Sequence, residues 1–306
     1  METPRLRDTN VQFWGMPGQF SVRVLQGMLD AGTNIVAIVT PASGNVGGAD
    51  PYVYLESQPH RSLLPLSNPY FHPNIIHIGW ERNIPVVEVR NLASSKTMQI
   101  LADHHADVAV VACFPWRIPP QILSLPTAGF LNLHTSLLPE LRGPYPLFWT
   151  FRLGITAGLT VHYMDHELDT GDIVLQKEIG FPDGIFGYEA DILMAQHGAA
   201  MLALTCRNLA TGTMSRSPQS GNGSYYPRPG HEDFRIPTTW PARRAFNFIC
   251  GTAEWGHPFQ IVGHDIDLIV RSAISFEPET IMQQTFLRNG SDYQIQFSPG
   301  LLHARR

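Results

Sequence analysis

The run Asp107-Val-Ala-Val-Val-Ala-Cys113 carries five apolar residues without interruption. Such a run, with no polar alternation, is typical of a strand that is buried on both faces, as in a parallel sheet covered by helices. Three earlier runs are also predicted as strands: Val11–Gly15, Asn34–Thr40 and Ile84–Val89. Apolar residues at helical spacing lie between strands, over Phe20–Ala31 and Ser95–His104. This alternation predicts an α/β fold with a doubly wound, mostly parallel sheet.

The remainder of the chain changes character after a further helix, predicted over Tyr188–Leu209. Residues 210–225 are rich in Ser, Gly and Thr, which favours a linker. Beyond it, a short helix and several short strands are predicted: Trp240–Phe248, then Phe259–Val262, Asp267–Ile274, Thr285–Arg288 and Tyr293–Phe297. We therefore expect a catalytic domain over 1–209 and a small β-rich domain over 226–306, joined by the linker.

Composition excludes several classes of protein. The 306 residues are 43% hydrophobic and carry a formal charge of −5, so nothing in the bulk charge attracts nucleic acid or an anionic membrane. The three cysteines are far apart and lack Cys-x-x-Cys spacing, which fits a reducing compartment. The amino terminus has no apolar core of a signal peptide, and no apolar run is long enough to span a bilayer. We expect a cytoplasmic protein.

Polar residues capable of catalysis gather in two segments after the apolar run. The first is Asn132-Leu-His134-Thr-Ser-Leu-Leu-Pro139-Glu-Leu-Arg142-Gly143, and the second contains Leu168-Asp169-Thr-Gly171-Asp172. Asn132 and His134 are two positions apart, so on a strand their side chains share one face. An amide, an imidazole and a carboxylate at one point can stabilise an oxyanion and move a proton. That chemistry suits acyl transfer without a Ser or Cys nucleophile.

These two segments closely resemble the folate-dependent formyltransferases, and within them the methionyl-tRNA formyltransferases. The resemblance implies that Asn132 and His134 polarise the formyl carbonyl and hold the tetrahedral oxyanion. Asp169 would then orient His134, favour its protonated form, and help a water molecule to relay protons from the attacking amine. His162 falls at a position that varies in the family, and we interpret it as a strand residue.

The same resemblance implies a binding cleft for the donor, 10-formyltetrahydrofolate. It would be formed by two segments that follow strands, with candidate contacts Phe114, Trp116, Ile118, Pro119, Ser136, Leu137, Leu138 and Pro139. Asp165 joins this set as a candidate, although the first interpretation of Asp165 and Asp172 is that they cap turns around the catalytic loop. The turn Gly15–Gly18 lacks a dinucleotide-binding fingerprint, and no compact metal-ligand spacing is present, so neither a nicotinamide nor a metal is expected.

The acceptor amine is less closely defined. In tRNA-binding members of the family, the region that corresponds to Pro41–Glu81 is a basic loop, but here it contains one arginine, Arg61, and six prolines. Residues 226–306 carry eight arginines against eight acidic residues, although Arg243-Arg244 and Arg305-Arg306 remain possible phosphate contacts. Since phosphate binding depends on Lys and Arg, we expect a small amine, an amino sugar or an ornithine-type molecule, to be preferred. Methionyl-tRNA is the alternative, favoured by the domain order.

Two other classes of protein are alternatives. A formyltetrahydrofolate hydrolase shares the amide, imidazole and carboxylate, but only about ten residues precede the first predicted strand, which leaves no room for the extra amino-terminal domain of such hydrolases. A non-catalytic folate- or RNA-binding protein is disfavoured because the full set of candidate catalytic residues is present. The resemblance further implies that the carboxy-terminal domain is an open barrel related to the OB-fold. The oligomeric state is unknown.

Overall fold

The structure, a computed structural model, describes residues 9–42, 50–56 and 73–306. The chain divides into two compact units that exchange segments along the sequence. Unit 1 comprises residues up to His134 with Leu159–Lys177 and Met194–Gly221, and unit 2 comprises Thr135–Gly158, Glu178–Leu193 and Asn222–Arg306. The division into domains over 1–209 and 226–306 stays a prediction.

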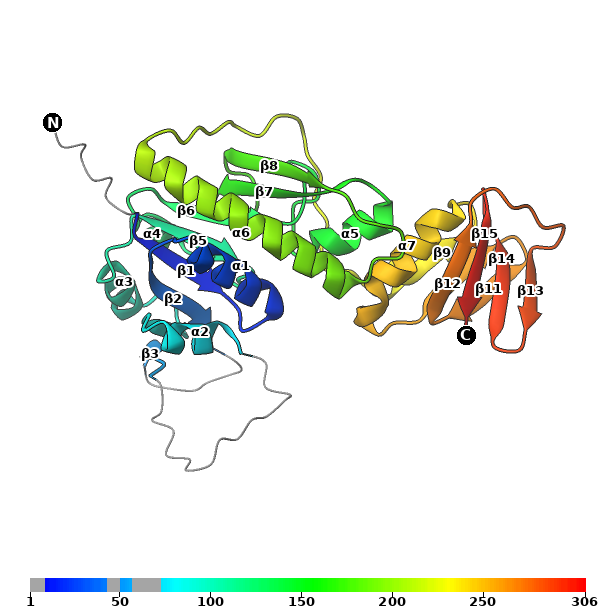
Figure 1. The fold of residues 1–306 in the computed structure, drawn as a ribbon, viewed down its shortest axis with the longest axis horizontal. Coiled ribbons are helices and arrows are strands. Elements are labelled where there is room, and N and C mark those ends of the chain that lie inside the picture. Colours follow the sequence, from blue (N-terminus) through cyan, green and yellow to red (C-terminus); the bar gives the residue numbers. More distant parts are fainter. Residues whose placement is uncertain (1–8, 43–49, 57–72) are drawn as a thin grey trace, which may run out of the picture. The chain divides into compact units, whose positions relative to one another are not determined.

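An eight-stranded sheet forms the centre of the first part of the chain (Figure 1). Its order is β3-β4-β2-β1-β5-β6-β7-β8. The strands are β1 (Val11–Gly15), β2 (Ile35–Pro41), β3 (Tyr52–Tyr54), β4 (Val86–Val89), β5 (Val108–Ala112), β6 (Phe130–His134), β7 (Ala157–Tyr163) and β8 (Ile173–Ile179). β1, β2, β4, β5 and β6 are mutually parallel, while β3 and β7 run antiparallel to β4 and β6. The predicted mostly parallel α/β sheet is confirmed.

Helices cover this sheet, and they are α1 (Gln19–Asp30), α2 (Ile75–Glu81), α3 (Ser95–Ala102), α4 (Pro120–Leu123) and α6 (Gly187–Thr211). On one side of the sheet, α6 passes directly over β6. A Cβ atom at Gly198 would lie 2.3 Å from Leu133 Cδ2, so only glycine admits this close approach. On the same helix, Ala199 contacts α1, because a Cβ at Gly27 would lie 2.7 Å from that of Ala199. Leu133 therefore points toward α6, which fixes the face on which its neighbours lie.

Unit 2 has an aromatic-rich core of its own that includes Phe148, Phe234, Phe248 and Phe259. Its described elements are α5 (Pro146–Leu153), two 3₁₀ turns η1 (His231–Phe234) and η2 (Ala253–Trp255), α7 (Ala242–Thr252), β9 (Arg235–Pro237), β10 (Phe259–Gly263), β11 (Ile266–Val270), β12 (Ser272–Glu277), β13 (Phe286–Asn289), β14 (Asp292–Gln296) and β15 (Leu301–Arg305). The strands form a three-stranded sheet, β11-β10-β9, and a four-stranded sheet, β12-β15-β14-β13. The expected β-rich carboxy-terminal region is confirmed.

Two details of this region differ from the prediction. The single strand expected over Asp267–Ile274 is two strands in different sheets, β11 and β12, which are separated at Arg271. The second difference is that neither β9 nor β15 is predicted, although β9 pairs with β10 and β15 pairs with both β12 and β14. Among the described residues, no helix is long and apolar enough to cross a bilayer.

Candidate active site

The side chains of Asn132 and His134 lie on one face of β6, at its carboxyl end. Leu133 between them packs against Gly198 of α6, and because alternate residues of a strand point to opposite faces, its two neighbours point away from that helix. His134 is 5% exposed. The predicted shared face of Asn132 and His134 follows from this packing.

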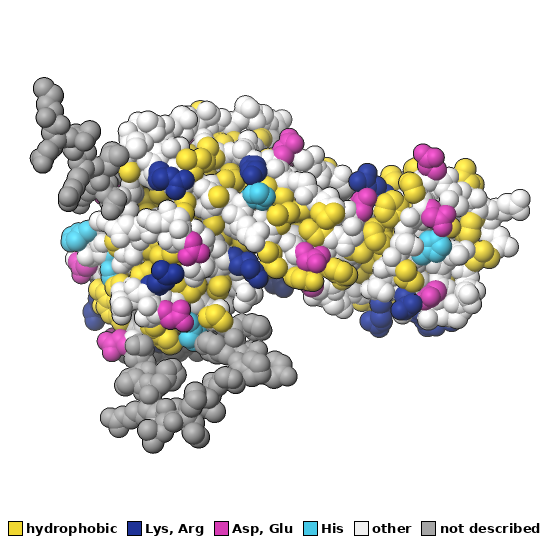
Figure 2. Space-filling model, in the orientation of Figure 1, with side chains coloured by type: hydrophobic (Ala, Val, Ile, Leu, Met, Phe, Trp, Pro, Cys, Tyr) yellow, Lys and Arg dark blue, Asp and Glu magenta, His cyan; other side chains and the backbone are white. Residues whose placement is uncertain are grey.

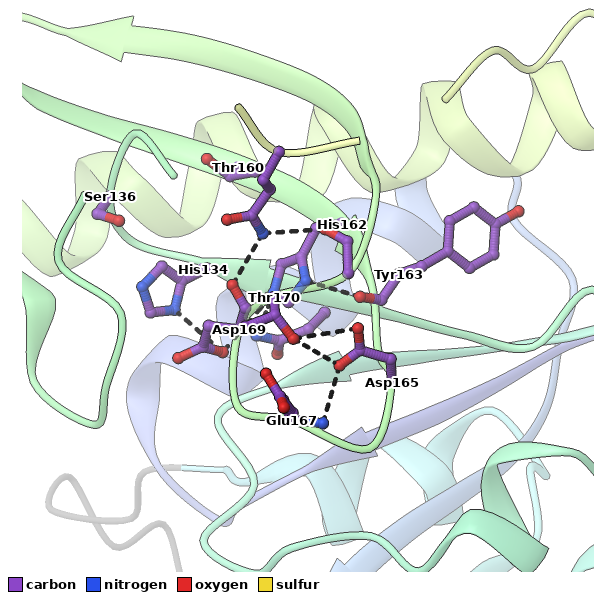
Figure 3. Close-up of polar contacts among 12 residues, drawn as sticks. His134, Ser136, Thr160, His162, Tyr163, Asp165, Glu167, Asp169 and Thr170 are labelled. Carbon is purple, nitrogen blue, oxygen red and sulfur yellow. Dashed lines mark hydrogen bonds and ion pairs between the residues drawn. The ribbon is translucent and has the colours of Figure 1, made fainter. Parts of the chain in front are cut away.

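Asp169 reaches the same point from the turn between β7 and β8 (Figure 3). Its Oδ1 lies 3.8 Å from His134 Nδ1, and the carboxylate is only 8% exposed. The backbone of Asp169 has φ +56°, a left-handed conformation that is uncommon outside glycine. The structure thus places the three predicted residues Asn132, His134 and Asp169 close together, and Asp169 has an uncommon backbone conformation.

His162 completes the group, although the sequence analysis treated it as an ordinary strand residue. It lies directly opposite Asn132 in the antiparallel β6–β7 pairing, and Asn132 Nδ2 is 3.1 Å from His162 Nε2. His162 Nε2 is also 3.7 Å from Asp169 Oδ1. Only the register of two strands 30 residues apart reveals this contact. A sequence without that register offers no signal for it beyond the presence of an imidazole.

The hydrogen bonds of His162 define its protonation. Nδ1 lies 2.8 Å from the carbonyl oxygen of Tyr163, which can only accept, so Nδ1 carries a proton. The amide nitrogen of Asn132 can only donate, so Nε2 of His162 accepts and is unprotonated. His162 is 1% exposed, and burial, reinforced by the neighbouring His134, lowers the pKa of His162 to about 4. The ring is therefore neutral at physiological pH.

Asp165 organises the turn that carries Asp169. Its Oδ1 accepts hydrogen bonds from the Thr170 hydroxyl at 2.8 Å and from the Glu167 backbone N–H at 3.0 Å. Figure 3 shows these contacts on the side of the turn beneath Thr170. Such local bonds from an aspartate to its own turn are typical of a structural cap. They support the capping role rather than the folate contact as the use of this carboxylate.

The candidate folate segment that follows β5 offers an aromatic surface. Trp116 is 37% exposed, and Phe114 is half-buried with its ring 5.1 Å from that of Trp14 in an edge-to-face contact. Ile118 is buried in a hydrophobic cluster that includes Trp14 and Ile122, and Pro119 is the residue that precedes α4. The aromatic rings are therefore accessible to a ligand, whereas the side chain of Ile118 is not.

The second candidate folate segment follows β6 and belongs to unit 2. Ser136 and Leu138 are buried, and the Ser136 hydroxyl donates to the Glu140 carbonyl at 2.6 Å, which stabilises the turn. Leu137 and Pro139 are partly exposed. Ser136 and Leu138 can meet a ligand only through their backbone groups, while Leu137 and Pro139 can also offer side chains.

Across the described parts of the chain, no group of three or more His, Cys, Asp or Glu side chains is arranged to hold a metal ion. The group at the carboxyl end of β6 consists of two buried imidazoles, one buried carboxylate and the partly buried amide of Asn132, which are linked by contacts of 3.1–3.8 Å. This set can donate hydrogen bonds to a developing oxyanion and exchange protons.

Residues 52–182, which include all four of these side chains, match the family model described as formyl transferase. A methionyl-tRNA formyltransferase of Pelotomaculum thermopropionicum is 30% identical over 80% of this chain and 72% of its own length. One from Staphylococcus aureus is 28% identical over 90% of this chain and 85% of its own. The chain belongs to the folate-dependent formyltransferase family. It is an enzyme that transfers a formyl group from a folate donor.

Solved structures share the fold over nearly the whole chain. A sugar 3N-formyltransferase, WlaRD, solved with dTDP and 5-N-formyl-THF, has a TM-score of 0.65 and covers 98% of both chains at 14% identity. An N-formyltransferase from Helicobacter canadensis, in complex with folinic acid and dTDP-3-aminofucose, has a TM-score of 0.64 and covers 97% of this chain and 99% of its own, also at 14% identity. At this identity the likeness concerns the fold alone.

Proposed function

We propose that the enzyme moves the formyl group of 10-formyltetrahydrofolate to a small primary amine, an amino sugar or an ornithine-type molecule, in preference to methionyl-tRNA. In this proposal Asn132, His134 and Asp169 carry the reaction. The observation that supports it most is the convergence of the buried His134 and Asp169 with the partly buried Asn132 at the carboxyl end of β6, where Asp169 Oδ1 lies 3.8 Å from His134 Nδ1. Ligands of open α/β sheets bind beyond that end of the strands.

The reaction begins when the neutral amine of the acceptor attacks the formyl carbon and its carbonyl oxygen becomes an oxyanion. Asp169 contacts Nδ1 of His134, so Nε2 is the atom proposed to reach that oxygen. The tetrahedral intermediate then collapses, the bond from carbon to folate N10 breaks, and N10 takes up a proton. The proton lost by the amine passes through Asp169 and water and is the proton that N10 takes up, so the transfer is balanced in atoms and charge.

Asn132 is the second proposed donor to the oxyanion. Its amide nitrogen has two N–H groups, and one of them is directed at His162 Nε2 at 3.1 Å. This bond orients the amide and leaves the other N–H for the oxyanion. A pre-oriented donor needs no reorganisation when charge develops, which is the main source of its catalytic effect.

The donor is proposed to contact Phe114–Pro119 and Ser136–Pro139. The exposed ring of Trp116 and the half-buried ring of Phe114 offer flat apolar surface to a pteridine. Ser136–Pro139 follows His134 directly in the chain, so it cannot be far from the proposed reaction centre.

The preference for a small acceptor rests on the arginines. Three of the four that the sequence offered as phosphate contacts are engaged within unit 2. Arg243 Nε lies 2.7 Å from Asp183 Oδ1, and Arg305 Nε lies 2.8 Å from Asp292 Oδ1. Arg244 donates to the Arg152 carbonyl and its guanidinium lies 3.7 Å from the centre of the Trp240 ring. An arginine paired with an aspartate offers less net charge for the counterion release that drives binding to tRNA, and this applies to Arg243 and Arg305.

Figure 2 supports the same preference. On the face that it shows, the Lys and Arg side chains of the described residues form separate groups, and several lie beside acidic ones. Within Pro41–Glu81, residues 43–49 and 57–72 lie outside the described residues, and Arg61 is among them. The composition of this region, with one arginine and six prolines, supports the preference for a small acceptor.

Methionyl-tRNA is the second candidate acceptor. Curated relatives from P. thermopropionicum and S. aureus carry the name methionyl-tRNA formyltransferase, and they match 80% and 90% of this chain. The two similar structures are instead a sugar 3N-formyltransferase and an N-formyltransferase bound to dTDP-3-aminofucose, which makes an amino sugar the first small acceptor to test.

One assay separates these acceptors. Loss of 10-formyltetrahydrofolate is followed at physiological salt with methionyl-tRNA, a dTDP-linked 3-amino sugar, and ornithine, and the formylated product is identified by mass spectrometry. We expect faster turnover with the amino sugar or ornithine. Efficient turnover of methionyl-tRNA alone would reject the preference and leave the formyl-transfer chemistry unchanged.

A further inference from the structure

We propose that Gln219 is a positioning residue for this reaction, acting by holding the turn that carries Asp169. The inference rests on the proposed catalytic role of Asp169. Gln219 Nε2 donates to the carbonyl oxygen of Asp169 at 2.8 Å and to that of Gly171 at 2.9 Å. Gln219 lies in the segment that the sequence suggested was only a linker, and about 50 residues beyond the turn in the chain.

The turn needs such support because its conformation is uncommon. Asp169 has φ +56°, a left-handed conformation that is uncommon for residues other than glycine, although aspartate adopts it more readily than most. Gly171 is pressed against β7, because a Cβ atom there would lie 2.0 Å from the Tyr163 carbonyl oxygen. On one side the turn is therefore packed tightly against β7. The side-chain amide of Gln219 binds the carbonyl oxygens of Asp169 and Gly171.

Gln219 belongs to the segment 214–219, which we call the strap, and contacts of other strap residues hold it in place. Ser217 and Ile173 exchange two backbone hydrogen bonds of 2.8 and 2.9 Å. Arg216 Nε lies 3.5 Å from Asp172 Oδ2, and its guanidinium lies 5.1 Å from the centre of the Tyr163 ring. Gln219 is half-buried, whereas the strap residues from 215 to 218 are exposed. A residue so anchored can restrain the turn instead of moving with it.

Asp165 and Gln219 restrain the turn in different ways. The Asp165 carboxylate binds the Thr170 hydroxyl and the Glu167 N–H, which closes the turn on itself. Gln219 is the restraint on Asp169 and Gly171 that comes from the distant strap. Loss of the Gln219 amide should leave the turn formed but let the Asp169 carboxylate shift from His134. Displacements near 1 Å in a catalytic group can cost about 100-fold in rate.

The test compares Gln219→Leu and Gln219→Asn with Ser217→Ala, in the full-length protein and with the acceptor that the panel turns over fastest. Ser217→Ala changes an exposed side chain of the same strap and keeps the backbone pairing, so it should match the wild type. Gln219→Leu should lower kcat by about 10- to 100-fold with KM for the folate changed less than about 3-fold. Gln219→Asn keeps the donor on a shorter side chain and should recover part of kcat. A melting curve confirms that each variant is folded.

A double-mutant cycle with Asp169→Asn decides whether Gln219 acts through Asp169. If it does, Gln219→Leu adds almost nothing to the loss caused by Asp169→Asn, because the group it positions is already absent. Additive losses, or a near-normal kcat for folded Gln219→Leu, would overturn the inference. If Asp169→Asn alone kept a near-normal kcat, the proposed role of Asp169 would fail and the inference with it. If Asp169→Asn is inactive but Gln219→Leu has a normal kcat, the role of Gln219 is rejected and the proposed role of Asp169 stands.

Discussion

Asn132 and His162 lie directly opposite each other across the β6–β7 pairing, and Asn132 Nδ2 is 3.1 Å from His162 Nε2. Cross-strand neighbours of this kind have their side chains held on one face of the sheet. The buried, neutral imidazole is therefore the residue that orients the amide of Asn132. His162, which the sequence suggests is an ordinary strand residue, thus supports Asn132, the proposed oxyanion donor.

Replacing His162 should weaken catalysis without abolishing it. In His162→Leu the Asn132 amide loses one hydrogen bond, which is worth roughly 0.5–1.5 kcal/mol, so kcat should fall by about 3- to 10-fold. Affinity for the folate, measured by fluorescence quenching, should change less than about 3-fold. His264→Asn, at an exposed turn, serves as the control. An unchanged kcat in His162→Leu would show that Asn132 needs no such partner.

His162 should also make stability depend on pH. Because its pKa is lowered to about 4 in the folded protein, against about 6.5 in an unfolded chain, the unfolded state binds more protons between these values. The stability contributed by the neutral ring is present above pH 6.5 and is lost as the pH falls toward 4. The loss is on the order of 3 kcal/mol at most. Urea unfolding of wild type and His162→Gln at pH 7.5, 6 and 5 should show a shallower pH dependence in the variant. Equal slopes would contradict the buried neutral ring.

Gly198 should tolerate no larger side chain, because a Cβ there would lie 2.3 Å from Leu133 Cδ2. Gly198→Val should destabilise the protein by about 2 kcal/mol or more, since overpacking costs roughly 1–3 kcal/mol and strains χ1 in a helix. Ala200→Val, at an exposed position of the same helix, should cost only about 0.5 kcal/mol. Thermal unfolding of the two variants compares them directly. Similar losses in both would mean that α6 does not press on β6.

Folate binding should protect two segments from hydrogen exchange, Phe114–Pro119 and Ser136–Pro139. The proposal places the donor against the aromatic rings of the first segment and the backbone of the second. Exchange measured by mass spectrometry with and without a saturating, non-reactive folate analogue gives the answer. The control is the strand β14, which carries no proposed ligand contact. Tight binding that leaves both segments unprotected would show that the donor lies elsewhere.

Much of this architecture follows from local sequence, and the remainder depends on distant pairing. Apolar runs such as Val11–Gly15 mark buried strands because a parallel sheet covered by helices has no polar face. Asn132 and His134 are predicted from one local segment, and Asp169, 35 positions further on, is predicted from the resemblance to the formyltransferase family. The roles proposed for His162 and Gln219 have no such signal, since they depend on contacts to residues about 30 and 50 positions away. The strand β15 was missed because it pairs with two strands whose order the sequence does not reveal.

The proposed reaction depends on the three residues that meet at the carboxyl end of β6, Asn132, His134 and Asp169. Single-turnover transfer from 10-formyltetrahydrofolate is measured for wild type, Asn132→Ala, His134→Ala and Asp169→Ala, alongside the dissociation constant of the folate. Each variant should lose about 100- to 1000-fold in the rate of transfer, because each group acts on charge that develops in the transition state, while folate binding stays measurable. A near-normal rate for His134→Ala would contradict the assignment of the active site.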